Sequence, residues 1–476
     1  MMTLLFSFIQ NALKQRISHS RGELANHFSG ISINSKTIKP EEIFIALQGE
    51  RFNGHQFIEE AFQKGCTLAI VSHDYQPPAS STPQAFLFVD DTLKALHDLS
   101  RNYLQSLPAK RIALTGSSGK TTTKELIRHV LSAVLGKEAV FASSGNQNNH
   151  FGVPLSAFAV TKKHQIAILE MGMNHFGEIA TLARIVQPNI GLITNMGMAH
   201  SGNLGGPDGV AKAKAELYEA LTKNDIAVVN ADDPRCLREA NAKVKGKKIT
   251  FGKVPWADIR IESIEPTWGK ADTQQSNSLG MHVTMVFQNQ KETAWLPLIG
   301  THNAQNAAAA VAVATALDLD FKAAMQGLSS MQAVHGRLET HTIFNGALLI
   351  DDTYNANPES MEAGLSALST WKNHRHVAIL GEMAELGENA YSIHRTLGAA
   401  CVQKNVDCLF ACGPNAKAYG EGAIAAGLPK ECFFWAKNSA EIAEMAASQI
   451  KNNDVILVKG SRIAEMEKVV TKLLSL

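Results

Sequence analysis

The spacing of apolar residues predicts that strands and helices alternate through the middle of the chain. Short apolar runs bounded by turn residues favour buried strands, and apolar positions three or four apart favour helices over residues 121–135 and 209–221. Strands that alternate with helices form parallel sheets with helices on both faces. The strand candidates are residues 111–115, 165–170, 190–194 and 226–230.

A second alternation of this kind runs from about residue 334 to the last residue, and it predicts a doubly wound α/β domain. Between the two alternations, residues 258–297 alternate polar with apolar positions, which indicates an antiparallel appendage. The alanine-rich run 303–316 favours a helix. The strand candidates of the second alternation are residues 347–351, 376–380, 406–411 and 455–458.

The N-terminal segment predicts a small α/β domain with buried strands at residues 43–47 and 67–71. Turn residues at 77–83 mark a candidate boundary, and residues 86–89 could form a strand on either side of it. We therefore predict an α/β protein of three domains. These are a small N-terminal domain over 1–88, a central P-loop-type parallel sheet with helices on both faces over 89–333, and a doubly wound domain over 334–476.

Composition excludes some classes of function. The 45 basic and 44 acidic residues give a formal net charge of +1, which argues against nucleic-acid binding through bulk charge. The six cysteines lack zinc-site spacing, so we expect buried free thiols in a reducing compartment. No run of 18 apolar residues exists, and the short apolar N-terminus lacks a basic leader, so we expect a cytoplasmic protein that does not enter membranes.

A candidate phosphate loop lies in the run RIALTGSSGKTTT at residues 111–123, where a buried strand meets a helix. Backbone amides at such a turn bind anions, Lys120 can neutralise phosphate charge, and the Thr121 hydroxyl can bind magnesium. The spacing is GxxGKT, shorter than the common GxxxxGK[ST] form. We assign to the nucleotide site Gly116, Ser117, Ser118, Gly119, Lys120, Thr121 and Thr122.

Two polar residues stand at or shortly after the ends of the next predicted strands. Glu170 ends the strand QIAILE, and His200 lies five residues after Asn195, the end of the strand IGLITN. Strand C-termini line the ligand crevice of an open parallel sheet, so both side chains are candidate magnesium ligands. The alternatives are a solvated acid at a strand end and a structural loop histidine. Further on, Lys212, Lys214 and Glu216 lie on a predicted helix, and periodicity alone would place all three on a solvated face.

These segments, in this order, resemble the Mur ligase family over almost the whole chain. The carrying motifs are TGSSGKTT, LEMGM, ITNMGMAH and VAKAKAEL. The resemblance implies an ATP loop, two Mg²⁺ ions held by Thr121, Glu170, His200 and Lys214, and carbamylation of Lys214. Lys120, Lys214, His200 and Glu170 are then the implied catalytic residues.

Three further segments match the family. GTHNAQNAA implies an adenine contact by Asn303, and HGR at 335–337 implies a phosphate contact by Arg337. In DDTYNANP, Asp352 is the implied ribose contact, with Tyr354 and Asn355 in the active cleft. Read by themselves, HGR could be a turn and NANP could cap a helix.

Other segments resemble the family branch that adds D-alanyl-D-alanine. GNQNNHFGVP at 145–154 carries the implied substrate residues Asn148 and Asn149. The N-terminal run Asn34-Ser35-Lys36 stands where the family usually has Asp-Ser-Arg, so only Ser35 is carried over. The resemblance implies that the chain uses ATP to join D-alanyl-D-alanine to UDP-N-acetylmuramoyl-tripeptide in peptidoglycan precursor synthesis. We expect a monomer, but the sequence itself does not reveal the oligomeric state.

Two alternatives remain open. A relative in the same superfamily could add another amino acid or act as a folylpolyglutamate synthase, although the uridine-type N-terminal segment argues against the folate enzyme. A P-loop NTPase switch would turn over ATP without any acyl acceptor. The third residue of the tripeptide, diaminopimelate or lysine, also stays open.

Overall fold

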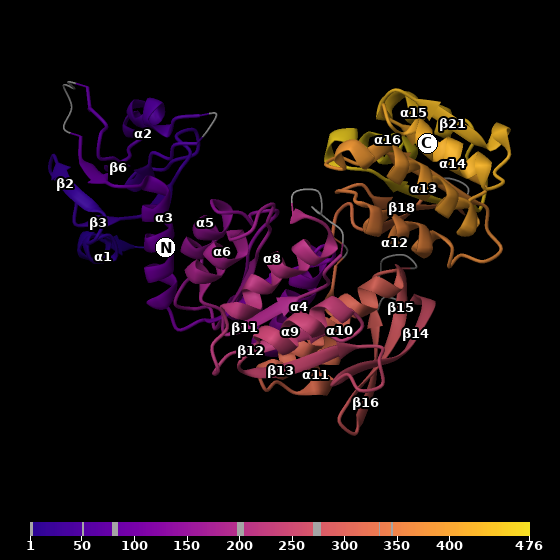
Figure 1. The fold of residues 1–476 in the computed structure, drawn as a ribbon, viewed down its shortest axis with the longest axis horizontal. Helices are drawn as coiled ribbons and strands as arrows, with labels where there is room; N and C mark the ends of the chain where they lie inside the picture. The colour runs from indigo at the N-terminus through magenta and orange to yellow at the C-terminus, as the bar shows by residue number, and fades with distance from the viewer. Residues whose placement is uncertain are drawn as a thin grey trace. The chain divides into compact units, whose positions relative to one another are not determined.

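The computed structural model describes residues 3–49, 52–78, 84–197, 204–269, 278–332, 334–343 and 346–476. Within these residues the strands form sheets of nine, six, five and two strands, with helices between many of the successive strands (Figure 1). This confirms the predicted α/β class. The chain divides into two compact units, one of residues 1–113, 138–172 and 178–189, the other of residues 114–137, 173–177 and 190–476.

The N-terminal elements are β1 (Leu4–Leu5), α1 (Phe6–Ala12), β2 (Ile17–Arg21), β3 (His27–Phe28), β4 (Gly30–Ser32), β5 (Glu42–Ile45), α2 (Ile58–Gln63), β6 (Leu68–Ser72), β7 (Phe86–Val89) and α3 (Thr92–Gln105). Their five-stranded sheet has the order β2-β7-β6-β5-β4. The predicted strands at 43–47 and 67–71 are confirmed as β5 and β6. Strand β7 pairs with β6 and β2, so residues 86–89 belong to this sheet.

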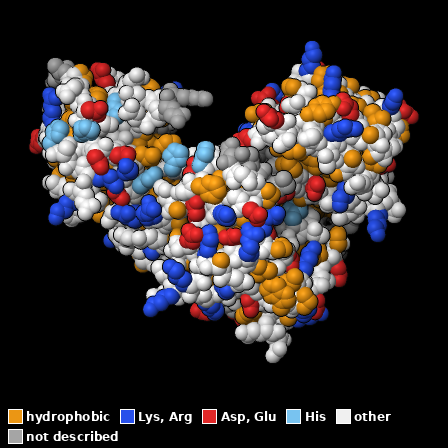
Figure 2. All heavy atoms as spheres, in the orientation of Figure 1, with side chains coloured by type: hydrophobic (Ala, Val, Ile, Leu, Met, Phe, Trp, Pro, Cys, Tyr) orange, Lys and Arg blue, Asp and Glu red, His pale blue; other side chains and the backbone are white. Residues whose placement is uncertain are grey.

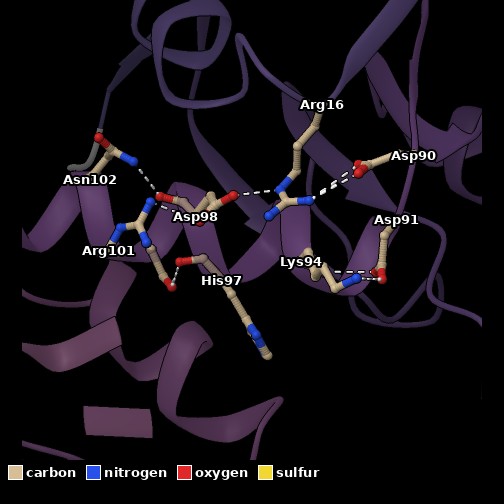
Figure 3. A network of polar contacts seen from close by, with 9 residues as sticks. Arg16, Asp90, Asp91, Lys94, His97, Asp98, Arg101 and Asn102 are labelled. Atoms are coloured by element: carbon tan, nitrogen blue, oxygen red, sulfur yellow. Dashed lines mark hydrogen bonds and ion pairs between the residues drawn. The ribbon is translucent and has the colours of Figure 1, made fainter. Parts of the chain in front are cut away.

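A charged network fastens helix α3 to the segment before β2 (Figure 3). The Asp98 carboxylate lies between two guanidinium groups, paired with Arg16 on one oxygen and 2.9 Å from Arg101 on the other. Arg16 also reaches Asp90 at 3.1 Å. Asp91 caps the helix by accepting the N–H of Lys94, which satisfies an amide that the first helical turn leaves unpaired.

The central strands are β8 (Lys110–Thr115), β9 (Val140–Ala142), β10 (Ile166–Glu170), β11 (Ile190–Ile193), β12 (Ile226–Asn230), β13 (Lys247–Gly252), β14 (Ile259–Gly269), β15 (Ser278–Phe287) and β16 (Gln290–Leu296). They form one sheet in the order β16-β15-β14-β13-β12-β11-β8-β10-β9. Strands β10 and β11 are buried along their whole length, as strands covered on both faces must be. Strands β14, β15 and β16 pair antiparallel, which confirms the predicted appendage.

The helices of this region are α4 (Lys120–Leu135), α5 (Gly152–Phe158), α6 (Glu178–Val186), α8 (Pro207–Glu219), α9 (Pro234–Lys243), α10 (Thr301–Ala316) and α11 (Phe321–Gly327). The predicted helices over 121–135, 209–221 and 303–316 are thereby confirmed as α4, α8 and α10. Helix α10 packs against α4, and its alanine side chains allow it to be buried on most of its circumference.

The C-terminal strands are β17 (Glu339–Thr342), β18 (Leu348–Asp352), β19 (His376–Gly381), β20 (Cys408–Cys412), β21 (Phe433–Ala436) and β22 (Val455–Lys459). Their order is β17-β18-β22-β19-β20-β21. Among the described strands of this sheet, β17 and β18 pair antiparallel and the other neighbours pair parallel. Helices α12 (Pro358–Leu368), α13 (Ala390–Gln403) and α14 (Lys417–Ala425) cover one face, and α15 (Ser439–Ala447) and α16 (Glu467–Leu474) cover the other. The predicted doubly wound domain is confirmed.

Surface and core agree with the compositional expectations. On the face in Figure 2, acidic and basic side chains are interspersed. All six cysteines are free thiols, and all but Cys432 are buried. Burial raises the pKa of Cys401 and Cys412 to about 12, so these thiols are unreactive. In the described part of the chain, every helix is too short or too polar to cross a bilayer.

Candidate functional site

The predicted phosphate loop lies between β8 and α4, at the point where a buried strand turns into a helix. Gly119 takes a φ of +76°, which an L side chain rarely adopts. A Cβ on Gly119 would lie 2.7 Å from the Asn306 side chain, and one on Gly116 would lie 1.8 Å from the Thr194 hydroxyl. Glycine is therefore required at both ends of the loop, and the loop leads into a helix N-terminus, where phosphate commonly binds.

The end of β11 holds this loop in place. The N–H of Ser118 donates to Asn195 Oδ1 over 3.0 Å, and the Thr194 hydroxyl donates to the Ser118 carbonyl over 2.7 Å. Asn230, at the end of β12, donates to the Thr194 carbonyl over 2.7 Å. The sequence identified Asn195 as a polar strand end, and the structure shows that it positions the phosphate loop.

Two cations lie at the loop. Lys120 Nζ donates to the Gly116 carbonyl over 2.7 Å, and Arg337 Nη2 donates to the Thr121 hydroxyl over 3.1 Å. The Arg337 guanidinium also lies over the Tyr354 ring, 4.2 Å from its centroid. Its buried Nε lacks a hydrogen-bond partner among the described residues, so it is a donor available to a ligand. The predicted residues Lys120, Thr121, Arg337 and Tyr354 are thus brought together.

Asp352 forms a buried ion pair that the sequence did not reveal. Lys459 Nζ, on a side chain that is 2% exposed, lies 2.6 Å from Asp352 Oδ2 and donates to the Asn355 carbonyl over 3.0 Å. Burial raises the pKa of the Asp352 carboxyl, and the Lys459 charge opposes that rise. Lys459 therefore fixes both Asp352 and Asn355. The available signal was a cation at the end of the buried strand VILVK.

Asn303 lies buried in the first turn of α10 and is linked to the phosphate loop. Its Nδ2 donates to the Ile299 carbonyl over 2.8 Å, and its Oδ1 accepts from Asn306 over 3.0 Å. Asn306 is the residue that faces Gly119. Beside them, burial and then the positive charge of Lys459 lower the pKa of His302 to about 4, so this imidazole is neutral near pH 7.

Lys214 is buried, 1% exposed, so the solvated face predicted from periodicity is wrong for this residue. It holds for Lys212, which is exposed, and in part for Glu216, which accepts the N–H of Gly177 over 2.7 Å. Burial, and then the positive charge of Lys120, lower the pKa of Lys214 well below its usual range. Both effects favour the uncharged form of its amine.

Glu170 is 2% exposed at the end of β10, which excludes a solvated strand-end acid. Its Oε1 accepts from Asn148 Nδ2 over 2.9 Å, so two predicted site residues are in direct contact. Asn149 instead uses its side-chain oxygen locally, accepting the N–H of Phe151 and of Gly152 at the start of α5.

Three other predicted features have simple local structures. The Ser35 hydroxyl donates to Glu60 over 2.7 Å. Asn357 caps α12 in a capping box with Pro358 in the first turn, as the helix-cap interpretation of NANP predicted. The HGR segment forms a turn around Gly336, whose φ is +68°, as the alternative interpretation predicted. Turn and cap nonetheless carry Arg337 and Tyr354 to the phosphate loop. His200 lies outside the described residues.

Comparison with known proteins gives matches along nearly the whole chain. Family profiles described as "Mur ligase family, catalytic domain", "Mur ligase middle domain" and "Mur ligase, glutamate ligase domain" match residues 27–104, 114–314 and 336–462. The UDP-N-acetylmuramoyl-tripeptide–D-alanyl-D-alanine ligase of Bacillus subtilis is 32% identical over 474 residues, which cover 98% of this chain and 99% of that protein.

Solved structures agree. A crystal structure of MurF from Acinetobacter baumannii superimposes with a TM-score of 0.86 at 30% identity, covering 100% of this chain and 99% of that one. The MurF ligase of Thermotoga maritima in complex with ADP gives a TM-score of 0.80 at 27% identity, covering 94% and 97%.

A glycine loop at a strand-to-helix turn, with an arginine from the C-terminal segment upon it, defines a nucleotide-binding protein of the P-loop type. The profiles and the full-length relatives then specify which one. The chain belongs to the Mur ligase family.

Proposed function

We propose that the chain uses ATP to join D-alanyl-D-alanine to UDP-N-acetylmuramoyl-tripeptide. The observation that carries this proposal is the contact of Arg337 with Thr121 of the phosphate loop, which gives one nucleotide site residues from both the middle and the C-terminal segment. The substrates follow from the named relatives, which match 98% of the chain in the first case. Mass spectrometry of the product should show one tripeptide joined to one dipeptide, with ADP and phosphate released.

In the proposed reaction the terminal carboxylate of the tripeptide attacks the γ-phosphorus of ATP. An acyl phosphate and ADP form, and the dipeptide amine then attacks the acyl carbon, so that an amide forms and phosphate leaves with a proton. The phosphate-loop amides, Lys120 and Arg337 neutralise charge on the transferring group, which is the main contribution a protein makes to phosphoryl transfer. Asn303 and Asp352 would orient adenine and ribose.

We assign magnesium binding to Thr121, Glu170, His200 and Lys214 as two sites. The described donors fit a hard cation, since Glu170 offers a buried carboxylate and Thr121 a hydroxyl at the helix N-terminus. Magnesium would shield the phosphate oxygens and balance their charge. The orientation of Glu170 is already set by Asn148.

Lys214 fits this donor set as a carbamate. A neutral buried amine can attack carbon dioxide, forming an N–C bond and releasing a proton. Its pKa is lowered by burial and by Lys120, which favours the neutral form. The product carries a negative charge close to the Lys120 cation and offers two oxygen ligands. Carbamylation therefore converts a repulsion between two lysines into an attraction.

The substrate contacts we propose are Ser35 for the uridine nucleotide, Asn148 and Asn149 for the tripeptide, and Tyr354 and Asn355 for the reacting end. The domain bounds 1–88, 89–333 and 334–476 are part of the same proposal. We propose a monomer, because Thr121 and Arg337 of one chain already meet. Six free thiols favour the reducing cytoplasm.

A further inference from the structure

A second cluster of ionisable side chains lies where the C-terminal sheet begins. Strands β17 and β18 run antiparallel, and Glu339 is the direct partner of Asp351. Directly opposed residues of such a pair project to the same face, so the two carboxylates face each other. His335 in the preceding turn joins them, and ligand atoms of all three residues lie within 4.8 Å of one another.

The cluster carries unbalanced negative charge. Asp351 is 0% exposed, and its Oδ1 accepts the N–H and the hydroxyl of Thr353 at 3.0 and 2.7 Å. Its Oδ2 is buried and has no hydrogen-bond donor among the residues that the structure describes. A buried carboxylate oxygen without a partner is costly, and a second carboxylate opposite increases that cost.

Neither neighbouring histidine donates a hydrogen bond to the unpartnered Oδ2 of Asp351. His335 Nδ1 lies 3.0 Å from Glu339 Oε2, and its side chain is 84% exposed. His341, two residues along β17, has a buried Nε2 that lacks a hydrogen-bond partner in the described part of the chain, and this atom lies 3.8 Å from Glu339 Oε1. Unpartnered atoms on Asp351 and on His341 therefore lie near the same carboxylate, that of Glu339.

We propose that His335, Glu339 and Asp351 form a binding site for a divalent transition-metal ion, with His341 beside it. One imidazole and two carboxylates suit Zn²⁺ and related first-row ions. Ligand atoms about 2.0–2.2 Å from a tetrahedral ion lie roughly 3.4 Å apart, within the spread that the cluster already has. Thr353 donates a hydrogen bond to Oδ1 of Asp351, in the way that residues around a metal site commonly hydrogen-bond to its carboxylate ligands.

The site uses other residues than the proposed nucleotide site, but these residues adjoin Arg337 and Asp352 in the chain. Gly336 donates to Glu339 Oε2 over 3.3 Å and accepts the N–H of Tyr354 over 3.0 Å, so the turn that presents Arg337 is fastened between these strands. A bound ion would cross-link this turn to β18 through His335 and Asp351. The site is independent of the proposed ligase reaction, and its test does not require turnover.

The test measures Zn²⁺ on the chelator-treated full chain by equilibrium dialysis in excess Mg²⁺. The wild type should bind one equivalent more than His335→Gln and one more than Asp351→Asn, and Zn²⁺ should raise the melting temperature of the wild type but not of these two variants. His335→Gln alters an exposed side chain, so its folding is not at risk. His374→Gln removes an exposed histidine of the same domain and should keep the full stoichiometry.

Cobalt gives an independent signature. Co²⁺ added to the wild type should produce a visible ligand-field spectrum that both variants lose and His374→Gln retains. Equal Zn²⁺ stoichiometry in the wild type and both variants would overturn the site. So would the absence of any bound Zn²⁺ in the wild type.

Discussion

Arg337 donates a hydrogen bond to Thr121 over 3.1 Å, although 216 positions separate the two residues in the chain. The hydroxyl belongs to the phosphate loop, and the guanidinium belongs to a turn that precedes the C-terminal sheet. Stacking on Tyr354 holds the guanidinium in this position. A nucleotide in the loop would therefore meet a cation that a distant segment of the chain supplies.

Replacing Arg337 should damage catalysis more than folding. We expect Arg337→Ala to lower kcat/KM by about 10²–10³-fold, since it removes a donor aimed at developing phosphate charge. Arg337→Lys should recover only part of this loss, because lysine keeps the charge but not the forked donors or the stacking on Tyr354. Arg238→Lys, on an exposed arginine, is the control. Steady-state phosphate release measures all three, and wild-type kinetics in Arg337→Ala would exclude Arg337 from the site.

Activity should depend on carbon dioxide through Lys214. Lys214→Ala should lose most activity and regain part of it with added short-chain carboxylates, which can replace the carbamate oxygens. Lys212→Ala changes an exposed lysine on the same helix and should behave as the wild type, since a surface charge contributes only about 0–1 kcal/mol. Turnover is measured in degassed buffer with and without bicarbonate. A fully active Lys214→Ala enzyme without bicarbonate dependence would contradict the carbamate.

Breaking the buried pair of Asp352 and Lys459 should destabilise the fold. Lys459→Met leaves the Asp352 carboxylate buried without its partner, and we expect a loss of about 3–5 kcal/mol of unfolding free energy. The double variant Asp352→Leu, Lys459→Met should lose less, because no isolated charge remains. Lys468→Met breaks an exposed pair and should cost at most about 1 kcal/mol. Urea unfolding measures these values, and equal losses in Lys459→Met and Lys468→Met would refute the argument.

His302 should make stability fall in mild acid. Its pKa is about 4 in the fold, against 6.5 for an ordinary histidine, so below pH 6.5 the unfolded chain binds a proton that the folded chain does not. The stabilising contribution is present above pH 6.5 and is lost progressively down to about pH 4, amounting to at most about 3 kcal/mol. Unfolding of the wild type and His302→Gln is compared at each pH, relative to pH 8. Parallel curves between pH 6.5 and 4 would show that His302 does not contribute.

Local sequence patterns predicted the features that depend on local physics. The GxxGKT loop needs only a buried strand, two glycines and a helix start, and the structure places Gly116 and Gly119 where side chains would clash. Glu170 could be recognised because a parallel strand delivers its last residue to the ligand edge of the sheet. The helix cap at Asn357 and the turn at Gly336 are likewise encoded within a few residues.

Features that depend on strand order and helix packing could not be predicted in this way. Lys459 reaches Asp352 because β22 lies directly beside β18, and their register places the two residues side by side. The opposition of Glu339 and Asp351 likewise requires the register of β17 and β18. Periodicity places Lys214 wrongly because alanines flank it on both sides in the sequence of α8. These small side chains let the helix be buried around most of its circumference.

ATP turnover by this chain serves amide formation between two acceptors. UDP-N-acetylmuramoyl-tripeptide accepts the phosphoryl group, and D-alanyl-D-alanine accepts the acyl group. The most direct measurement is phosphate release with ATP and Mg²⁺ in four mixtures: both acceptors, UDP-N-acetylmuramoyl-tripeptide alone, D-alanyl-D-alanine alone, and neither. We predict sustained turnover only with both acceptors. The acyl phosphate forms only when the tripeptide is present, and it is consumed only when the dipeptide amine is present. Turnover that is equal in all four mixtures would contradict the ligase and favour a nucleotide switch.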